Sequence, residues 1–267
     1  MRPVRMLAIL LRHFYLLRGS PARIVPLFAW TAVDMTLWGF FTRYLDTLAA
    51  PGFHLVPAVL GAVLLWNFFI RVMNSVTGVF FEDVWSRNFL NMFAAPISIG
   101  DYLGGLVLSS IGTSLIGLLV MLFLVTAVFG LAFFSFGLVL IPFVLELFLF
   151  GVSMGILGCS IVLRFGPAAE WFVWPIPSIL APFATVFYPL STLPVWMRPV
   201  SRMLPPSYVF ETLRAIVAGR QPPASGILTG AVLVSAYLVL ACLVFTGIYR
   251  RAVRTGLIAR YSAETVS

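Results

Sequence analysis

The stretch YLGGLVLSSIGTSLIGLLVMLFLVTAVFGLAFFSFGLVLIPFVL, residues 102–145, contains no charged residue. About 20 apolar residues are enough for a helix to cross the roughly 30 Å hydrocarbon core of a bilayer, so the stretch is long enough for two crossings. Gly130 and Gly137 mark the place where we expect the chain to turn. Such long runs exclude the short strands of a barrel, and only helices and barrels satisfy their backbone in lipid. The stretch therefore predicts two spanning helices.

The rest of the chain has the same character. Of its 267 residues, 61% are hydrophobic and only 10% are charged, a balance that a water-soluble protein cannot cover with polar surface. We therefore expect an all-α integral membrane protein in which residues 1–267 form a single membrane domain. The expected six spans are 24–41, 55–81, 102–129, 138–163, 171–190 and 227–249.

The N-terminal residues 1–22 predict a helix lying in the membrane interface. Leu7, Leu11 and Phe14 fall on one helical face, and Arg5 and Arg12 fall on the opposite side. Six spans place both termini on one side of the membrane, and that side carries most of the arginines, which favours cytoplasmic termini in a bacterial inner membrane. These arginines are Arg2, Arg5, Arg12, Arg18, Arg23, Arg87, Arg164, Arg250, Arg251, Arg254 and Arg260.

Prolines interrupt the segment before the last span. Residues 171–190 contain four prolines, which predicts kinks or a break in the fifth span. Residues 192–219 contain four more, are amphipathic and are too polar to span. A row of small residues on the fourth span, Gly151, Gly155 and Cys159, predicts close helix packing.

Several chemistries are excluded by residue type. The sequence has no lysine, so it lacks the phosphate-binding loop of an ATPase, and we expect ATP and magnesium to be bound by a partner subunit. His13 and His54 have no Cys or carboxylate at a metal-ligand spacing, so no metal site is expected. The pI near 10.2 comes from arginines at the ends of the chain, for which lipid head groups are a simpler partner than nucleic acid.

Three ionisable residues fall inside predicted spans, where a charge is costly unless it is paired or hydrated. They are Asp34, Arg71 and Glu146. Arg71 lies on a polar stripe with Asn67 and Asn74 at helical spacing. The stripe either lines a translocation path or is a packing face on which Asp34 neutralises Arg71, and both interpretations stay open.

Residues 82–98 directly follow the second span and predict a short amphipathic helix that ends at Pro96. Such a helix offers apolar side chains to the groove of a partner, and its alternative is an ordinary interfacial loop. The candidate coupling residues are Glu82, Asp83, Trp85, Arg87, Phe89, Leu90 and Phe93.

Residues 182–219, PFATVFYPLSTLPVWMRPVSRMLPPSYVFETLRAIVAG, resemble the C-terminal consensus of type-2 ABC permeases. Two positions depart from that consensus: Ala184-Thr185 stands where Ser-Gly is usual, and Pro206 stands where Leu or Thr is common. The matching residues are Phe187, Tyr188, Pro189, Leu193, Pro194, Pro205, Tyr208 and Arg214.

The resemblance implies that residues 192–219 form re-entrant helices at the outer face. It also implies a permease homodimer with an ABC ATPase subunit, exporting an amphipathic or lipid-linked substrate as relatives export drugs, polysaccharides or nodulation factors. Two other functions stay open from the residues alone: an ion-coupled secondary transporter using Asp34, Arg71 and Glu146, and an intramembrane enzyme or assembly scaffold.

Overall fold

The computed structural model describes residues 3–19, 21–48, 55–86, 97–130, 140–221 and 224–256. Within these ranges the chain is helical and contains no strand, which confirms the predicted all-α class. The helices are α1 Pro3–Arg18, α2 Pro21–Leu48, α3 Leu55–Trp85, α5 Ile99–Phe129, α6 Leu140–Phe165, η2 Pro167–Phe172, α7 Ile176–Leu180, η3 Leu190–Thr192, α8 Met197–Arg202, α9 Pro205–Val217 and α10 Ala224–Arg254.

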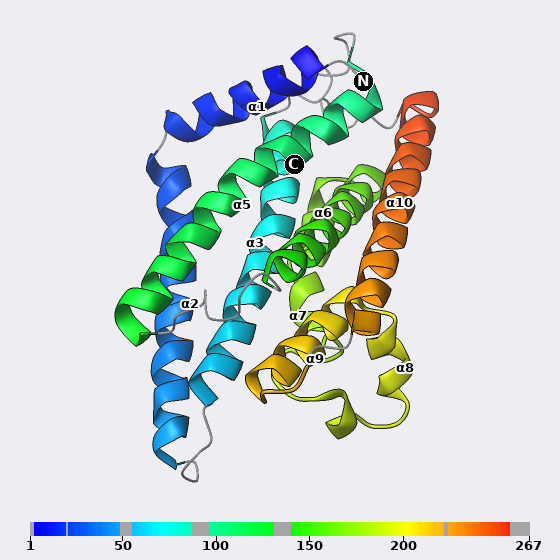
Figure 1. Ribbon diagram of the computed structural model, residues 1–267. Helices are drawn as coiled ribbons and strands as arrows, with labels where there is room; N and C mark the ends of the chain where they lie inside the picture. Colours follow the sequence, from blue (N-terminus) through cyan, green and yellow to red (C-terminus); the bar gives the residue numbers. More distant parts are fainter. Residues whose placement is uncertain are drawn as a thin grey trace.

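The long helices form a bundle that α1 crosses at one end and that α8 and α9 close at the other (Figure 1). We call these the α1 end and the α9 end. The last turns of α10 lie at the α1 end, so α1 and the end of α10 are on the same side of the bundle. The prediction that both terminal helices share a side agrees with this arrangement.

Four described helices have the length and mean hydropathy of a membrane span: Val59–Trp85, Ile99–Phe129, Leu140–Phe165 and Ser225–Arg254. The uncharged stretch thus supplies α5 and the start of α6, as expected. Gly130 ends α5 because it adopts the left-handed conformation (φ 68°) and donates its N–H to the carbonyl of Thr126 at 3.0 Å.

The predicted fifth span, 171–190, is not one continuous helix. It consists of the end of η2, the five-residue α7 and turns, because prolines remove backbone donors along it. The segment nevertheless extends along the bundle. The ring centroids of Trp174 and Phe81 are 6.3 Å apart near the α1 end, whereas the ring of Phe187 stacks on that of Trp38 in α2 with centroids 4.9 Å apart. The six-span count therefore stays a prediction.

The two faces of helix α1 have different surroundings. Its arginine side faces the protein: Arg5 pairs with Asp101 at 3.4 Å, and Arg12 pairs with Asp83. Its apolar side, which includes Val4, Leu7, Leu11 and Phe14, is exposed. An exposed apolar stripe on a helix across the end of a membrane bundle fits a position in the interface.

Small residues set the packing of α6 at the centre of the bundle. A Cβ added at Gly151 lies 2.8 Å from the Cβ of Val72, and one added at Gly155 lies 2.7 Å from the Cβ of Val76, so only glycine allows α3 this close. On another face, Phe150 contacts Tyr237 of α10 at 5.4 Å. The row of small residues is therefore a contact within one chain.

Candidate sites of translocation and coupling

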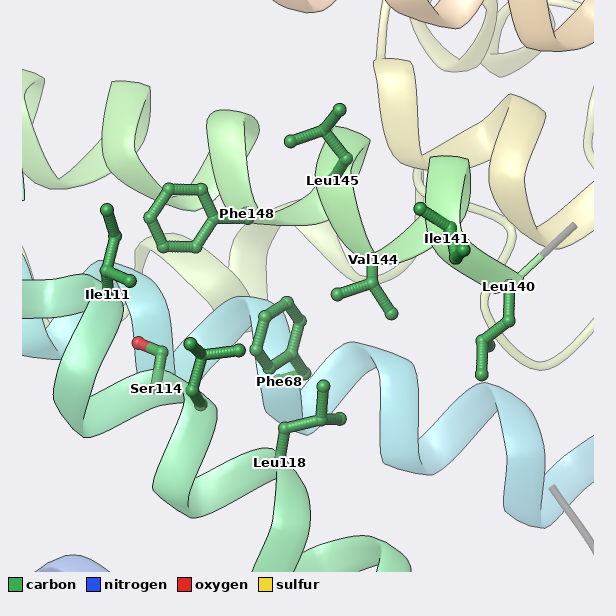
Figure 2. A pocket seen from close by; sticks show the side chains of 10 residues that line it. Phe68, Ile111, Ser114, Leu118, Leu140, Ile141, Val144, Leu145 and Phe148 are labelled. Carbon is green, nitrogen blue, oxygen red and sulfur yellow. The ribbon is translucent and has the colours of Figure 1, made fainter. Parts of the chain in front are cut away.

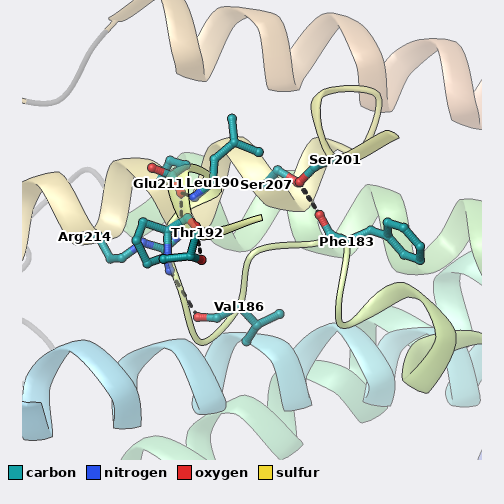
Figure 3. A network of polar contacts seen from close by, with 9 residues as sticks. Phe183, Val186, Leu190, Thr192, Ser201, Ser207, Glu211 and Arg214 are labelled. Carbon is teal, nitrogen blue, oxygen red and sulfur yellow. Dashed lines mark hydrogen bonds and ion pairs between the residues drawn. The ribbon is translucent and has the colours of Figure 1, made fainter. Parts of the chain in front are cut away.

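Residues 171–190, which we call the broken segment, accept hydrogen bonds from hydroxyl groups of α8 and α9. Both Ser201 and Ser207 donate hydrogen bonds to the carbonyl oxygen of Phe183, the latter at 3.2 Å (Figure 3). The two hydroxyls lie 3.2 Å apart and are buried. Since a free carbonyl inside a membrane protein costs several kcal/mol, these contacts let the backbone depart from a helix here.

An ion pair on α9 satisfies the next part of the segment. Glu211 accepts the backbone N–H of Leu190 at 2.7 Å and also pairs with Arg214 at 2.7 Å. Arg214 in turn donates to the carbonyl of Val186 at 3.2 Å (Figure 3). The pair therefore connects α9 to both sides of the turn at Pro189.

Several other residues of the motif that resembles type-2 ABC permeases also make hydrogen bonds to backbone groups in this region. Tyr188 donates to the carbonyl of Pro182 at 2.7 Å, and Tyr208 donates to the carbonyl of Arg202 at 2.9 Å. Leu193 accepts from Arg198 at 2.9 Å. Three further motif residues are placed in the same region: Pro189, whose carbonyl binds Thr192, Pro194, whose carbonyl binds the N–H of Met197, and Pro205, the buried first residue of α9.

Sequence reasoning found Arg214 but missed Ser201, Ser207 and Glu211. A signal was present for two of them, because Ser207, Glu211 and Arg214 follow one another at i, i+4 and i+7 on a single face of α9. A polar face on a helix beside a proline-rich segment indicates that its side chains bind that backbone. Ser201 lies on α8 and is not part of this helical spacing.

Thr185 has a strained backbone at the centre of the break. Its φ is 53°, in the left-handed region that a β-branched residue rarely adopts, and its side chain is fully buried. Its hydroxyl has no hydrogen-bond partner among the described residues. Residues 184 and 185 are where the type-2 ABC permease consensus that this segment resembles has Ser-Gly, and glycine would adopt this backbone conformation without strain.

The polar stripe of α3 packs against α2 and α5. Asn67 donates to the carboxylate of Asp34 at 2.7 Å, and Ser75 lies 2.5 Å from Thr113. Between them, Arg71 lies against Gly117, where an added Cβ is 1.7 Å from its Nε. These contacts agree with a packing face. A pair between Asp34 and Arg71, and the path-lining role of Asn74, stay predictions.

Glu146 is separate from this stripe. It lies on the side of α6 that meets α10, where a Cβ added at Gly230 is 2.3 Å from its Oε2. The residue is 5% exposed, and neither carboxylate oxygen has a hydrogen-bond partner among the described residues. The three intramembrane groups thus do not form one cluster.

The predicted coupling segment is described only at its start. Glu82, Asp83 and Trp85 belong to the last turn of α3, while Arg87, Phe89, Leu90 and Phe93 lie outside the described residues. Asp83 is fully buried and accepts from Arg12 and, at 3.0 Å, from the hydroxyl of Tyr102. Asp83 therefore points into the protein, and its part in coupling stays a prediction. Trp85 is exposed and donates to Glu170 at 2.9 Å.

An apolar cleft of about 480 Å³ opens where α5 and α6 diverge over α3. Figure 2 shows side chains of the three helices around it, among them Phe68, Leu118 and Val144. Ser114 supplies the one hydroxyl of its lining, and no described group bonds that hydroxyl. Such a cleft accepts apolar chains and not polar solutes.

These features define a class: a polytopic helical membrane protein whose broken penultimate segment is held by a short amphipathic helix. A family model described as ABC-2 type transporter matches residues 6–218, which is most of the chain. The chain therefore belongs to the ABC-2 type transporter family, whose members are the transport membrane subunits of ABC transporters. Membership implies an ABC ATPase as partner. No curated protein sequence matched the chain.

Proposed function

We propose that this chain is the permease half of an ATP-driven exporter in a bacterial inner membrane, acting as a homodimer with separate ATPase subunits. The observation that carries the proposal is the broken segment 171–190, whose backbone is bonded by α8 and α9 in a chain of the ABC-2 family. A segment bonded by side chains instead of its own helix is able to exchange partners without unfolding a spanning helix.

The substrate that the cleft supports best is amphipathic or lipid-linked. The cleft of about 480 Å³ has an apolar lining with one hydroxyl, that of Ser114, which no described group bonds, so it fits an apolar chain whose polar head lies elsewhere. Direction of transport and oligomeric state are part of the same proposal. ATP and magnesium are assigned to the partner subunit because the sequence has no phosphate-binding lysine.

The test begins with the tagged full-length chain purified from its native membrane. We expect an ABC ATPase to copurify, and we expect ATP hydrolysis in the complex but none in the chain alone. Proteoliposomes holding the complex should move a fluorescent lipid-linked oligosaccharide only when ATP is supplied on the ATPase side. A contaminant-free ATPase rate from the chain by itself would overturn the proposal.

A second candidate, an ion-coupled secondary transporter, is favoured by one observation. Glu146 is a buried carboxylate without a described partner, which is a feature of ion relays in membranes. Transport by the chain alone, driven by a proton gradient and abolished by Glu146→Gln, would establish this candidate. Transport that requires ATP and survives Glu146→Gln excludes it.

A further inference from the structure

A second cleft lies at the α1 end, between the final turns of α6 and α10. Its volume is about 250 Å³, and Arg164, Phe165, Ile248 and Arg251 line it. The two helices pack side by side in the same direction (Figure 1). Both have the composition of membrane spans, so their final turns lie where the hydrocarbon core meets the head groups.

The two arginines of this cleft have no acidic partner in the described part of the chain. Arg164 lies over the ring of Phe165 at 5.5 Å, and Arg251 is exposed. Three described carboxylates of this end, Asp83, Asp101 and Glu170, have other partners. Asp83 and Asp101 pair with α1, and Glu170 accepts the indole N–H groups of Trp85 and Trp174 at 2.9 and 3.1 Å.

We propose that this cleft binds the phosphate of an anionic phospholipid such as phosphatidylglycerol. The two guanidinium groups supply paired donors for phosphate oxygens. Phe165 and Ile248 form an apolar wall beside the two guanidinium groups. This wall can pack against the acyl chains of a lipid, whereas a free phosphate ion would gain nothing from it. Trp171 and Phe172, the last two residues of η2, are 79% and 73% exposed, as aromatic side chains are at membrane interfaces.

The site does not depend on the transport activity of the chain. Each arginine near an anionic lipid surface contributes roughly a fivefold gain in affinity, so the two together should contribute on the order of 25-fold. Phosphatidylcholine has a phosphate but no net charge, and it should gain much less from the same pair. The ratio of the two affinities therefore measures the site.

The experiment is native mass spectrometry of the full-length chain in detergent, titrated with phosphatidylglycerol or phosphatidylcholine. We expect the double variant Arg164→Gln/Arg251→Gln to lose phosphatidylglycerol affinity by about 25-fold and each single variant by about fivefold, with phosphatidylcholine unchanged. The control Arg18→Gln/Arg254→Gln removes the same charge from the same end outside the cleft and should keep the wild-type ratio. The charge-retaining variant Arg164→Lys/Arg251→Lys should recover most of the affinity.

Three results would overturn the proposal. Equal losses in the cleft and control variants would show a diffuse effect of charge instead of a site. Displacement of phosphatidylglycerol by millimolar inorganic phosphate would assign the cleft to a free anion. Full lipid binding by the glutamine variants, together with loss of the copurified ATPase, would assign it to an acidic protein surface. If the double variant fails to fold, the two single variants decide the matter.

Discussion

At the scale of single residues, Thr185 is the clearest place where the sequence and the backbone disagree. A β-branched residue at φ 53° costs about 1–3 kcal/mol, and its buried hydroxyl has no described partner. We predict that Thr185→Gly raises the free energy of unfolding by about 1 kcal/mol, because glycine adopts this conformation without strain but loses more entropy on folding. Thermal unfolding of the purified chain in detergent measures the change.

The control for Thr185 is Thr229, which is helical on α10 and binds the carbonyl of Ser225. There Thr229→Gly should lower stability by up to about 0.5 kcal/mol. The same sign at both positions would contradict the assignment of strain to Thr185. If Thr185→Gly lowers the free energy of unfolding, the packing of the threonine side chain stabilises the protein by more than its strained backbone destabilises it.

At the scale of the elements, the contact between α3 and α6 depends on glycine. An added Cβ at Gly155 meets the Cβ of Val76 at 2.7 Å and the carbonyl oxygen of Met73 at 3.1 Å, and backbone cannot move aside cheaply. We predict that Gly155→Ala destabilises the protein by about 1–3 kcal/mol. Gly112→Ala on α5, where a Cβ meets nothing within 4 Å, should instead stabilise it by up to about 1 kcal/mol.

The bond between α9 and the broken segment gives a second prediction for the elements. Removal of Arg214 leaves the carbonyl of Val186 without its donor, so Arg214→Gln should lower the free energy of unfolding by about 1–3 kcal/mol. Arg220→Gln is the matched control, because Arg220 is exposed and has no described side-chain bond. Since Glu211 and Arg214 share one network, Glu211→Gln and the double variant should give non-additive losses in a mutant cycle. Additive losses would show that the two residues act separately.

The sequence predicts the elements better than it predicts the bonds between them. The apolar runs determined α5 and α6, because length and hydropathy are local properties. Prolines indicated a break after η2 for the same reason. The bond of Ser201 to Phe183 joins positions 18 residues apart in the chain, and no helical periodicity in the sequence indicates it. The inward side of α1 was also hidden, because arginines that pair inside the protein have the same helical spacing as arginines in water.

At the scale of the whole molecule, α1 brackets the predicted coupling segment. Asp83 is the second residue of that segment, residues 82–98, and Asp101 lies just after it; both carboxylates pair with arginines of α1. Gly104 and Gly105 allow this closeness, since an added Cβ at Gly105 lies 2.7 Å from the Cβ of Ile9. The helices α1, α3 and α5 are thus joined at the α1 end, where α3 ends and α5 begins.

The last prediction follows from this joint. Arg12→Gln leaves the buried carboxylate of Asp83 with Tyr102 as its remaining described donor. We therefore expect the free energy of unfolding to fall by about 3 kcal/mol, and most of that loss to be recovered when Asp83→Asn is added. In the proposed complex, a loosened joint should lower transport per ATP hydrolysed while hydrolysis itself continues, because a force on the coupling segment then moves α3 without α1. Arg18→Gln, an exposed arginine on the same helix, should leave both quantities unchanged. Unfolding in detergent and paired transport and hydrolysis rates in proteoliposomes measure the two effects, and equal loss of transport and hydrolysis in Arg12→Gln would show that α1 serves stability alone.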